Sequence, residues 1–141
     1  MAEDAPAGFE RHFRQSPLTD PWEPLWSRRD GNRFLLGARI ASPHCNARGF
    51  AHGGLIAALA DNAMGLACVL KSGNPGALTA SLSLDFIGVA SVGQWLEVAA
   101  TPLKLGRALA FAEAHVTADG ALVARASAVF RLAESRPEER R

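Results

Sequence analysis

A single carboxylate stands in an otherwise apolar stretch of this chain, and it is the leading candidate for a reacting group. Between residues 54 and 70, every residue other than Asp61 and Asn62 is Gly, Ala, Leu, Ile, Met, Val or Cys. An ionised carboxylate among such residues is costly unless it is paired or used in chemistry. Packing alone therefore explains Asp61 poorly, although a cap or a pairing with a strand residue is an alternative.

A glycine pair stands where this apolar helix must begin. Gly53 and Gly54 allow a close approach of another backbone or of a ligand. The first turn of a helix also carries unpaired N–H groups at the positive end of its dipole. Together these features suit a carbonyl oxygen that becomes negative during a reaction. A tight loop-to-helix turn without chemistry is the other explanation of the pair.

The spacing of the two features limits how they can act together. Eight residues separate Gly53 from Asp61, which is roughly 12 Å along a helix axis. One reacting carbonyl cannot lie within about 3 Å of both. If the amide holds the carbonyl oxygen while the carboxylate drives attack on its carbon, the two groups come from different copies of the chain. The spacing therefore predicts a homodimer with its sites between subunits.

The helix must present these residues on an accessible face. Asp61 lies two turns beyond Gly54 on the same face, where its neighbours are Ala57, Ala58 and Gly65. A face of small residues lets a second backbone or a thin substrate approach the acid.

Alternating sequence patterns predict strands on both sides of this helix. Residues 33–41 form a first strand whose apolar side holds Phe34, Leu36, Ala38 and Ile40. Residues 78–86 are expected to be a half-buried strand, with an apolar side of Leu78, Ala80, Leu82, Leu84 and Phe86 and a polar side of Thr79, Ser81, Ser83 and Asp85.

Three further strands are predicted at residues 94–105, 108–118 and 121–132. They are joined at Gly106-Arg107 and at Asp119-Gly120, so they form an antiparallel meander. The inward positions of the last two strands are alanines, at 108, 110, 112, 114, 124, 126 and 128. Small side chains let the sheet curl closely around the helix, which predicts an α+β fold with one long helix wrapped by a curved antiparallel sheet.

The length of 141 residues predicts a single domain with one real core. Residues 1–32 read as an N-terminal arm with a short helix that packs on the domain, residues 33–133 as the domain itself, and residues 134–141 as a flexible tail. The arm is rich in aromatic residues, Phe9, Phe13, Trp22 and Trp26, which either pack on the sheet or cover a pocket.

Charge and cysteine content exclude several classes of protein. Fifteen basic and fourteen acidic side chains leave a net charge of +1, which argues against nucleic acid as a partner. Cys45 and Cys68 cannot form a disulfide framework, and they indicate a reducing compartment. The histidines and cysteines lack metal-ligand spacing, so no metal is expected. Because the apolar run is short and interrupted and no leader precedes it, we expect a cytoplasmic protein without a membrane partner.

The pattern Asn46-x-x-Gly49-x-x-His52-Gly53-Gly54 followed by Asp61 resembles the PaaI-like branch of the hotdog-fold acyl-CoA thioesterases. The resemblance extends over about residues 33–132, since the strand after the helix, the hairpin at Gly106 and the turn at Gly120 fall where that family has their counterparts. It implies the hotdog fold and an acyl-CoA substrate, with no cofactor.

The resemblance also implies roles for particular residues. Asp61 is the general base or nucleophile, and the amide of Gly53 polarises the thioester carbonyl. Asn46 orients the thioester or the water, and His52 supports the loop. Thr79 holds the attacking water beside Asp61. One base and one oxyanion donor suffice because a thioester is already electrophilic.

Coenzyme A is an anion with a long arm, so cations are expected along its path. The resemblance makes Arg107, together with Gly106, and Arg48 the candidates for binding it, with Gly54 at the carbonyl and Lys71 as a further cation. For each of these cations, the alternative is an ordinary role as a solvated charge on the surface. The assembly that the resemblance implies is a homodimer or a dimer of dimers.

Two other functions fit the same fold. A non-catalytic module that binds acyl-CoA or an acyl carrier would use the fold without turnover. A dehydratase or hydratase would need a catalytic histidine with an acid, whereas Asp61 stands alone on its helix face. The leading hypothesis is hydrolysis of a small or medium acyl-CoA, with aromatic acyl groups included.

Overall fold

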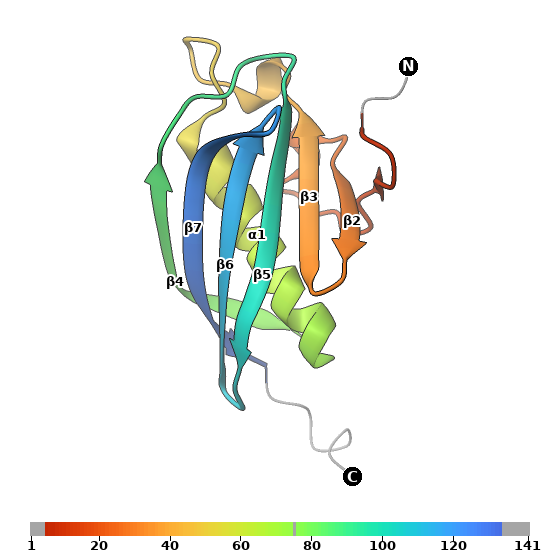
Figure 1. Cartoon of the computed structure of the whole chain (residues 1–141), viewed down its shortest axis with the longest axis vertical. Coiled ribbons are helices and arrows are strands. Elements are labelled where there is room, and N and C mark those ends of the chain that lie inside the picture. Colours follow the sequence, from red (N-terminus) through yellow and green to blue (C-terminus); the bar gives the residue numbers. More distant parts are fainter. Residues whose placement is uncertain (1–4, 75, 134–141) are drawn as a thin grey trace.

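A seven-stranded antiparallel sheet curves around one long helix in the computed structural model, which describes residues 5–74 and 76–133 (Figure 1). The strands are β1 (Glu10–Arg11), β2 (Trp26–Asp30), β3 (Arg33–Arg39), β4 (Ala77–Phe86), β5 (Trp95–Leu105), β6 (Leu109–Ala118) and β7 (Ala121–Leu132), and the helix is α1 (Gly53–Ser72). Two short 3-10 turns, Asp20–Trp22 and Ser42–His44, precede α1. This is the predicted hotdog architecture; the predicted tail at 134–141 lies outside the described residues.

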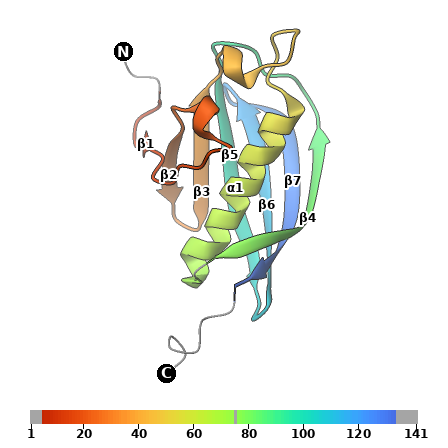
Figure 2. The ribbon, with the colours of Figure 1, turned by 180° about the vertical axis from the view of Figure 1, so that it is seen from behind.

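The sheet has the order β1-β2-β3-β5-β6-β7-β4, so β4 is an edge strand although it follows α1 directly in the chain. Seen from behind, α1 lies across the concave face of the sheet (Figure 2). The helix has the length and hydropathy of a membrane span, yet its large apolar side chains are buried in the core against the sheet, among them Leu55, Leu59 and Met64. It therefore packs as a core helix.

The meander agrees with its predicted pattern to within one residue at each end. Its inward alanines, at 110, 112, 114, 124, 126 and 128, are all buried, and they allow the close curl around α1. Ala108 is the exception. It is exposed because it lies in the turn before β6 and not in the strand, so its predicted inward position is wrong.

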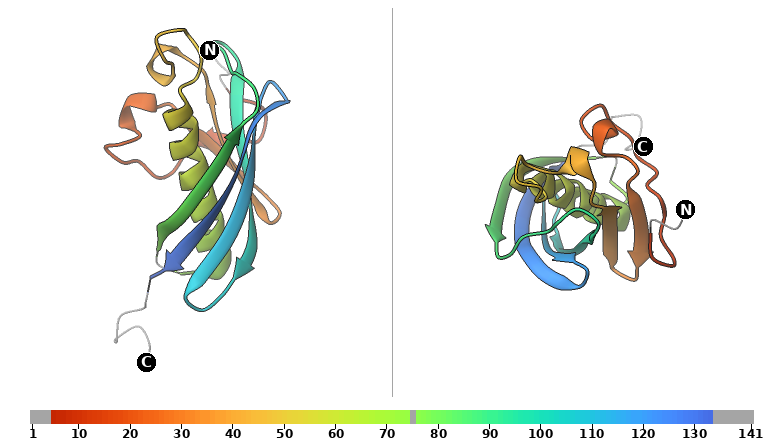
Figure 3. Two further views of the ribbon diagram at one scale, coloured as in Figure 1. Left: turned by 90° about the vertical axis from the view of Figure 1, so that its left-hand side faces the viewer. Right: turned by 90° about the horizontal axis from the view of Figure 1, so that it is seen from above.

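The region predicted as an irregular arm contains two strands that the sequence patterns do not show. β2 pairs with β3 in a hairpin, and β1 pairs with β2 at the edge of the sheet. The arm wraps around this edge (Figure 3). On the outer face Phe9 packs edge-on against Trp95 at 5.2 Å between ring centroids, and on the inner face the ring of His12 lies 5.9 Å from that of Phe34.

A close contact between β3 and β5 supplies a test of this packing. A Cβ at Gly37 would lie 2.3 Å from Cζ2 of Trp95, so Gly37→Ala forces the indole to move. We expect the free energy of unfolding to fall by about 1 to 3 kcal/mol, measured by urea denaturation. Gly76→Ala is the control, since no described atom lies within 4 Å of its added Cβ. Equal stability of the two variants would contradict this packing.

β4 differs from the half-buried strand that its sequence predicts. It pairs only with β7, and a bulge at Ala80 shifts the register between Thr79 and Ser81. Leu82, Leu84 and Phe86 face the same side as the core, but that side is only partly covered: Leu84 is half-buried against the core, whereas Leu82 and Phe86 are 37% and 55% exposed. An edge strand with an open apolar face is unusual in a chain that acts alone.

Candidate functional site

Asp61 and Thr79 meet where α1 passes β4. The hydroxyl of Thr79 donates a hydrogen bond of 2.6 Å to Oδ1 of Asp61. The bulge at Ala80 makes this contact possible, because it shifts the alternation of side chains along β4. Thr79 then lies on the same face of the sheet as its pairing partner Phe130, whose side chain is buried in the core. Strict alternation had placed Thr79 on the opposite face from Leu82, and that prediction is wrong.

The carboxylate is less buried than its apolar surroundings suggested. Asp61 is half-buried in the single chain, and it belongs to an open stripe of small residues along α1. The stripe consists of Gly54, Ala57, Ala58, Asp61 and Gly65, none of which is fully buried. The opposite side of the helix is buried in the core, so α1 has one packed face and one accessible face.

The N-terminus of α1 is capped in a way that leaves the N–H of Gly53 without an acceptor among the described residues. His52 is the N-cap, and its Nδ1 accepts a 2.8 Å hydrogen bond from the N–H of Gly54. Its carbonyl accepts from the N–H of Ile56 at 3.0 Å. Within the described part of the chain, the N–H of Gly53 has no acceptor. A free N–H at the positive end of a helix can hold a developing oxyanion.

Both glycines are close to other side chains. A Cβ at Gly54 would lie 3.0 Å from Nδ1 of His52, so glycine at this position leaves room for the cap. A Cβ at Gly53 would lie 3.3 Å from Cζ of Phe86, which places the open end of β4 beside the start of α1. The sequence patterns did not indicate this contact.

Asn46 shapes the loop that leads into the helix. Its Oδ1 accepts hydrogen bonds from the N–H groups of Arg48 at 2.9 Å and Phe50 at 3.2 Å. The guanidinium of Arg48 lies over the ring of Phe50, 5.9 Å from the centroid. In the single chain the Asn46 side chain thus holds the loop, and the loop positions His52 and the glycine pair.

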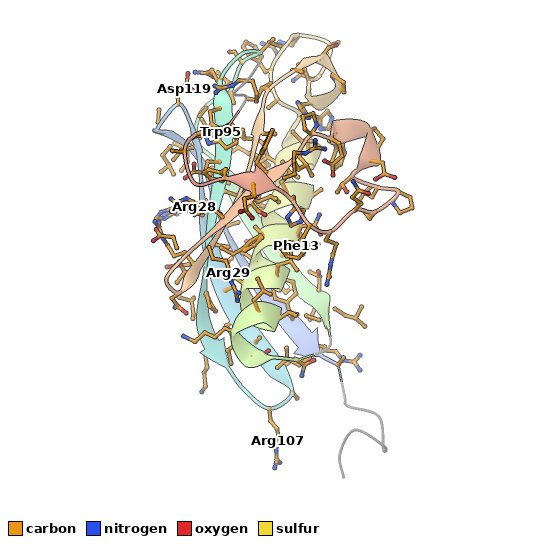
Figure 4. All side chains as sticks on the ribbon, turned by 90° about the vertical axis from the view of Figure 1, so that its right-hand side faces the viewer. Phe13, Arg28, Arg29, Trp95, Arg107 and Asp119 are labelled. Atoms are coloured by element: carbon orange, nitrogen blue, oxygen red, sulfur yellow. The ribbon has the colours of Figure 1, made fainter. Side chains whose placement is uncertain are left out.

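The remaining predicted binding residues lie apart from this helix end. Arg107 projects from the hairpin between β5 and β6, at the opposite end of the sheet from the loop 46–50 (Figure 4). Gly106 supports that hairpin, since its N–H donates to the carbonyl of Leu109 at 2.8 Å. The Nζ of Lys71 donates to Oδ1 of Asn32 at 2.7 Å. A single chain does not bring these groups together with Gly53.

A cavity of about 110 Å³ opens beside the Asp61–Thr79 pair. Its walls include Asn62, Gly65 and Phe130, and Arg14 of the arm also lines it. Arg14 was not predicted as a site residue, because nothing in its local sequence distinguishes it from other surface cations. In residues 5–74 and 76–133, no group of His, Cys, Asp and Glu side chains is arranged to hold a metal ion.

Neither cysteine takes part in this arrangement. Cys68 is fully buried in the core, and burial raises the pKa of its thiol, which disfavours the nucleophilic thiolate. The Sγ of Cys45 lies 3.4 Å from the carbonyl oxygen of Ala41. The carboxylate of Asp61 and the free amide of Gly53 are therefore the candidate reacting groups.

Known proteins are similar to this chain in sequence and in fold. The family model of the thioesterase superfamily matches residues 48–125. A protein of Pseudomonas aeruginosa that carries the provisional name of an esterase is 47% identical over 131 residues, which cover 92% of this chain and 98% of the relative. Human acyl-coenzyme A thioesterase 13 is 35% identical over 96 residues, which cover 65% of this chain and 67% of the relative.

Among solved structures, a mutant of the phenylacetic acid degradation protein PaaI from Thermus thermophilus matches with a TM-score of 0.73 and 25% identity, covering 82% of this chain and 98% of that protein. The family match spans more than half of the chain and contains the start of α1, Asp61 and Thr79. The chain therefore belongs to the thioesterase superfamily, and it is a hotdog-fold thioesterase of the PaaI-like branch.

Proposed function

We propose that this chain hydrolyses the thioester of small or medium acyl-CoA molecules, aromatic ones included, in the cytoplasm. The observation that carries the proposal is the Thr79–Asp61 hydrogen bond of 2.6 Å on the open face of α1. It provides a positioned carboxylate, and the uncapped N–H of Gly53 provides an oxyanion donor of the kind that acyl transfer requires. The likeness to a human acyl-coenzyme A thioesterase supports coenzyme A as the carrier.

In the proposed reaction, water binds between Thr79 and the free carboxylate oxygen of Asp61. Asp61 accepts a proton from the water as its oxygen adds to the thioester carbon, and the N–H of Gly53 stabilises the resulting oxyanion. Collapse of this intermediate breaks the carbon–sulfur bond. The CoA thiolate then takes the proton from Asp61, which leaves a free acid and the CoA thiol. Direct attack by Asp61 as a nucleophile is the alternative course, and it uses the same placement of the carboxylate.

The proposal requires a second copy of the chain. Gly53 and Asp61 are separated by roughly 12 Å along α1, so one carbonyl cannot contact both groups of a single helix. The open stripe of α1 and the uncovered apolar side chains Leu82 and Phe86 offer a surface for that copy. We propose a homodimer, assembled further as a dimer of dimers, in which Asp61 of one protomer faces Gly53 of its partner.

Binding of coenzyme A in the assembly involves residues from several places in the sequence. We propose that Gly54 lies at the thioester and that Arg48 and Arg107, with Gly106, contact the anionic part of the carrier. Because Arg107 and the loop 46–50 lie at opposite ends of one chain, one CoA molecule reaches both only if they belong to different protomers.

Release of free CoA thiol from a panel of aliphatic and aromatic acyl-CoA molecules tests the activity. We expect turnover of at least one class of small or medium acyl group, with kcat in the ordinary enzyme range of about 1 s⁻¹ or more. Tight binding of the panel without any thiol release would overturn hydrolysis and favour a non-catalytic binding module.

Thr79 is expected to contribute through its hydroxyl alone. Thr79→Val keeps the shape of the side chain and removes the hydrogen bond to a charged acceptor, so kcat should fall by about tenfold or more. Thr79→Ser is the matched control, because it retains the hydroxyl. Steady-state kinetics with one good acyl-CoA measures both variants, and full activity of Thr79→Val would exclude Thr79 from positioning the water.

A further inference from the structure

The N-terminal arm extends the cavity beside Asp61. A second cavity of about 50 Å³ lies between the arm and α1, and both cavities are lined by Arg14, Asn62 and Leu66. The second one also has His12 and the hydroxyl residues Ser16 and Thr19 in its wall. The second cavity therefore continues from the first toward the arm, and its wall there combines these polar residues with the apolar side chains of Leu25 and Leu36.

Arg14 supplies a positive charge in the wall of both cavities. Arg14 is exposed, and within the described residues its side chain makes no ion pair and no hydrogen bond, so its guanidinium is available to a ligand in the cavity. Burial lowers the pKa of the nearby His12 against the opposing effect of Glu23, and the positive charge of Arg14 lowers it further. His12 is thus neutral near pH 7, and Arg14 is the positive group next to the cavity.

Part of the wall of the larger cavity is apolar. Leu66, Val69 and Phe130 line the part of the cavity near Asp61, together with Gly65 and Ala77. A cavity of about 150 Å³ holds a benzene ring, so about 110 Å³ suits a chain of a few carbon atoms. A cavity that has this apolar wall and is also lined by the guanidinium of Arg14 fits a short carbon chain that bears an oxygen.

We propose that Arg14 is a specificity-determining residue that selects short acyl groups bearing an acceptor oxygen, a carboxylate above all, at the end away from the thioester. The inference rests on the proposed hydrolysis of acyl-CoA and names its substrate class. Arginine binds carboxylates through two parallel hydrogen bonds, and it is always protonated. It also offsets the repulsion between an anionic acyl group and the carboxylate of Asp61, which lines the same cavity.

Three acyl groups of equal length test the inference: pentanoyl, 5-hydroxypentanoyl and glutaryl, which end in a methyl, a hydroxyl and a carboxylate. Their non-hydrolysable thioether analogues of CoA report Kd by calorimetry, and the thioesters report kcat/KM. We expect glutaryl to be favoured over pentanoyl by about tenfold or more in both measurements, with 5-hydroxypentanoyl between them. Because the measurement of Kd requires no turnover, binding of the acyl group in the cavity is tested independently of hydrolysis.

Variants of Arg14 assign the preference to this residue. Arg14→Leu should abolish the preference for glutaryl and leave the pentanoyl values within about twofold, and Arg14→Lys should retain part of it. Arg29→Leu, which removes an exposed cation of β2 that lines neither cavity, should change nothing. Equal Kd values for the three analogues in the wild type would overturn the inference. Equal weakening of all three by Arg14→Leu would also overturn it, since Arg14 would then contact the CoA part.

Discussion

Replacing Asp61 with asparagine should lower kcat by about 10²- to 10⁴-fold while the protein keeps its fold and binds acyl-CoA almost as before. Asparagine has nearly the same shape, and its carbonyl oxygen can still accept the hydrogen bond that Thr79 donates to Oδ1. What is lost is the negative charge and the ability to take a proton from water. The measurement is thiol release from the acyl-CoA panel, with Kd of a thioether analogue as the readout of binding.

Asp85→Asn is the matched control for this prediction. Asp85 is a carboxylate on the outer face of β4, exposed and 2.9 Å from the guanidinium of Arg125. An exposed ion pair contributes little to stability, so this variant should keep both turnover and fold. If Asp61→Asn retained turnover within a few-fold of the wild type across the panel, Asp61 would be neither the base nor the nucleophile, and the proposed mechanism would be wrong.

The parts of the fold that follow a simple period were predictable. In β6 and β7 the alanines recur at every second position, and the two turns that bound the strands carry glycine. Period and turn together fix both register and the inward face, because a shift of one residue would expose every alanine. The apolar run of α1 is similarly plain, since it begins after a capping residue and ends at Gly73 in a left-handed conformation, with φ of 72°.

Thr79 shows where such reasoning fails. Alternation along residues 78–86 put Thr79 on the polar side of its strand, whereas the family resemblance put it beside Asp61. The two expectations conflict unless the strand contains a bulge, and the bulge at Ala80 is what reconciles them. In a row of small and polar residues, a bulge hardly changes the pattern of apolar and polar positions. The sequence patterns alone therefore could not locate it.

The arm could not be predicted for a different reason. Its position depends on single long-range contacts, such as the 2.9 Å hydrogen bond between Nε2 of His44 and the carbonyl of Trp22. Nothing periodic in residues 5–25 encodes those contacts. Consequently β2 and the approach of Arg14 to the cavity appear only in the folded chain, although Arg14 forms part of the wall beside Asp61.

Gly53→Pro should lower kcat by about 10²- to 10³-fold, because it removes the one N–H that the proposed oxyanion site uses. Proline is well tolerated at the first helical position, where the N–H has no partner within the helix. The preceding residue, His52, already has the extended conformation that proline demands, with φ of −69° and ψ of 138°. Gly53→Ala is the matched control: it meets the same ring of Phe86 but keeps the N–H. Equal activities of the two variants would exclude the amide as the oxyanion donor.

Gly53→Pro, combined with Asp61→Asn, also tests whether each site is shared between two chains. In a dimer of one Asp61→Asn chain and one Gly53→Pro chain, one site joins the intact Gly53 of the first chain to the intact Asp61 of the second, and the other site is doubly defective. Random mixing of the two chains should therefore recover about a quarter of wild-type activity, because half of the dimers are mixed and each has one good site of two. If Gly53 and Asp61 acted within one chain, every site in the mixture would carry a defect. Activity no greater than that of the separate variants would then refute the shared site, and with it the requirement for a second copy.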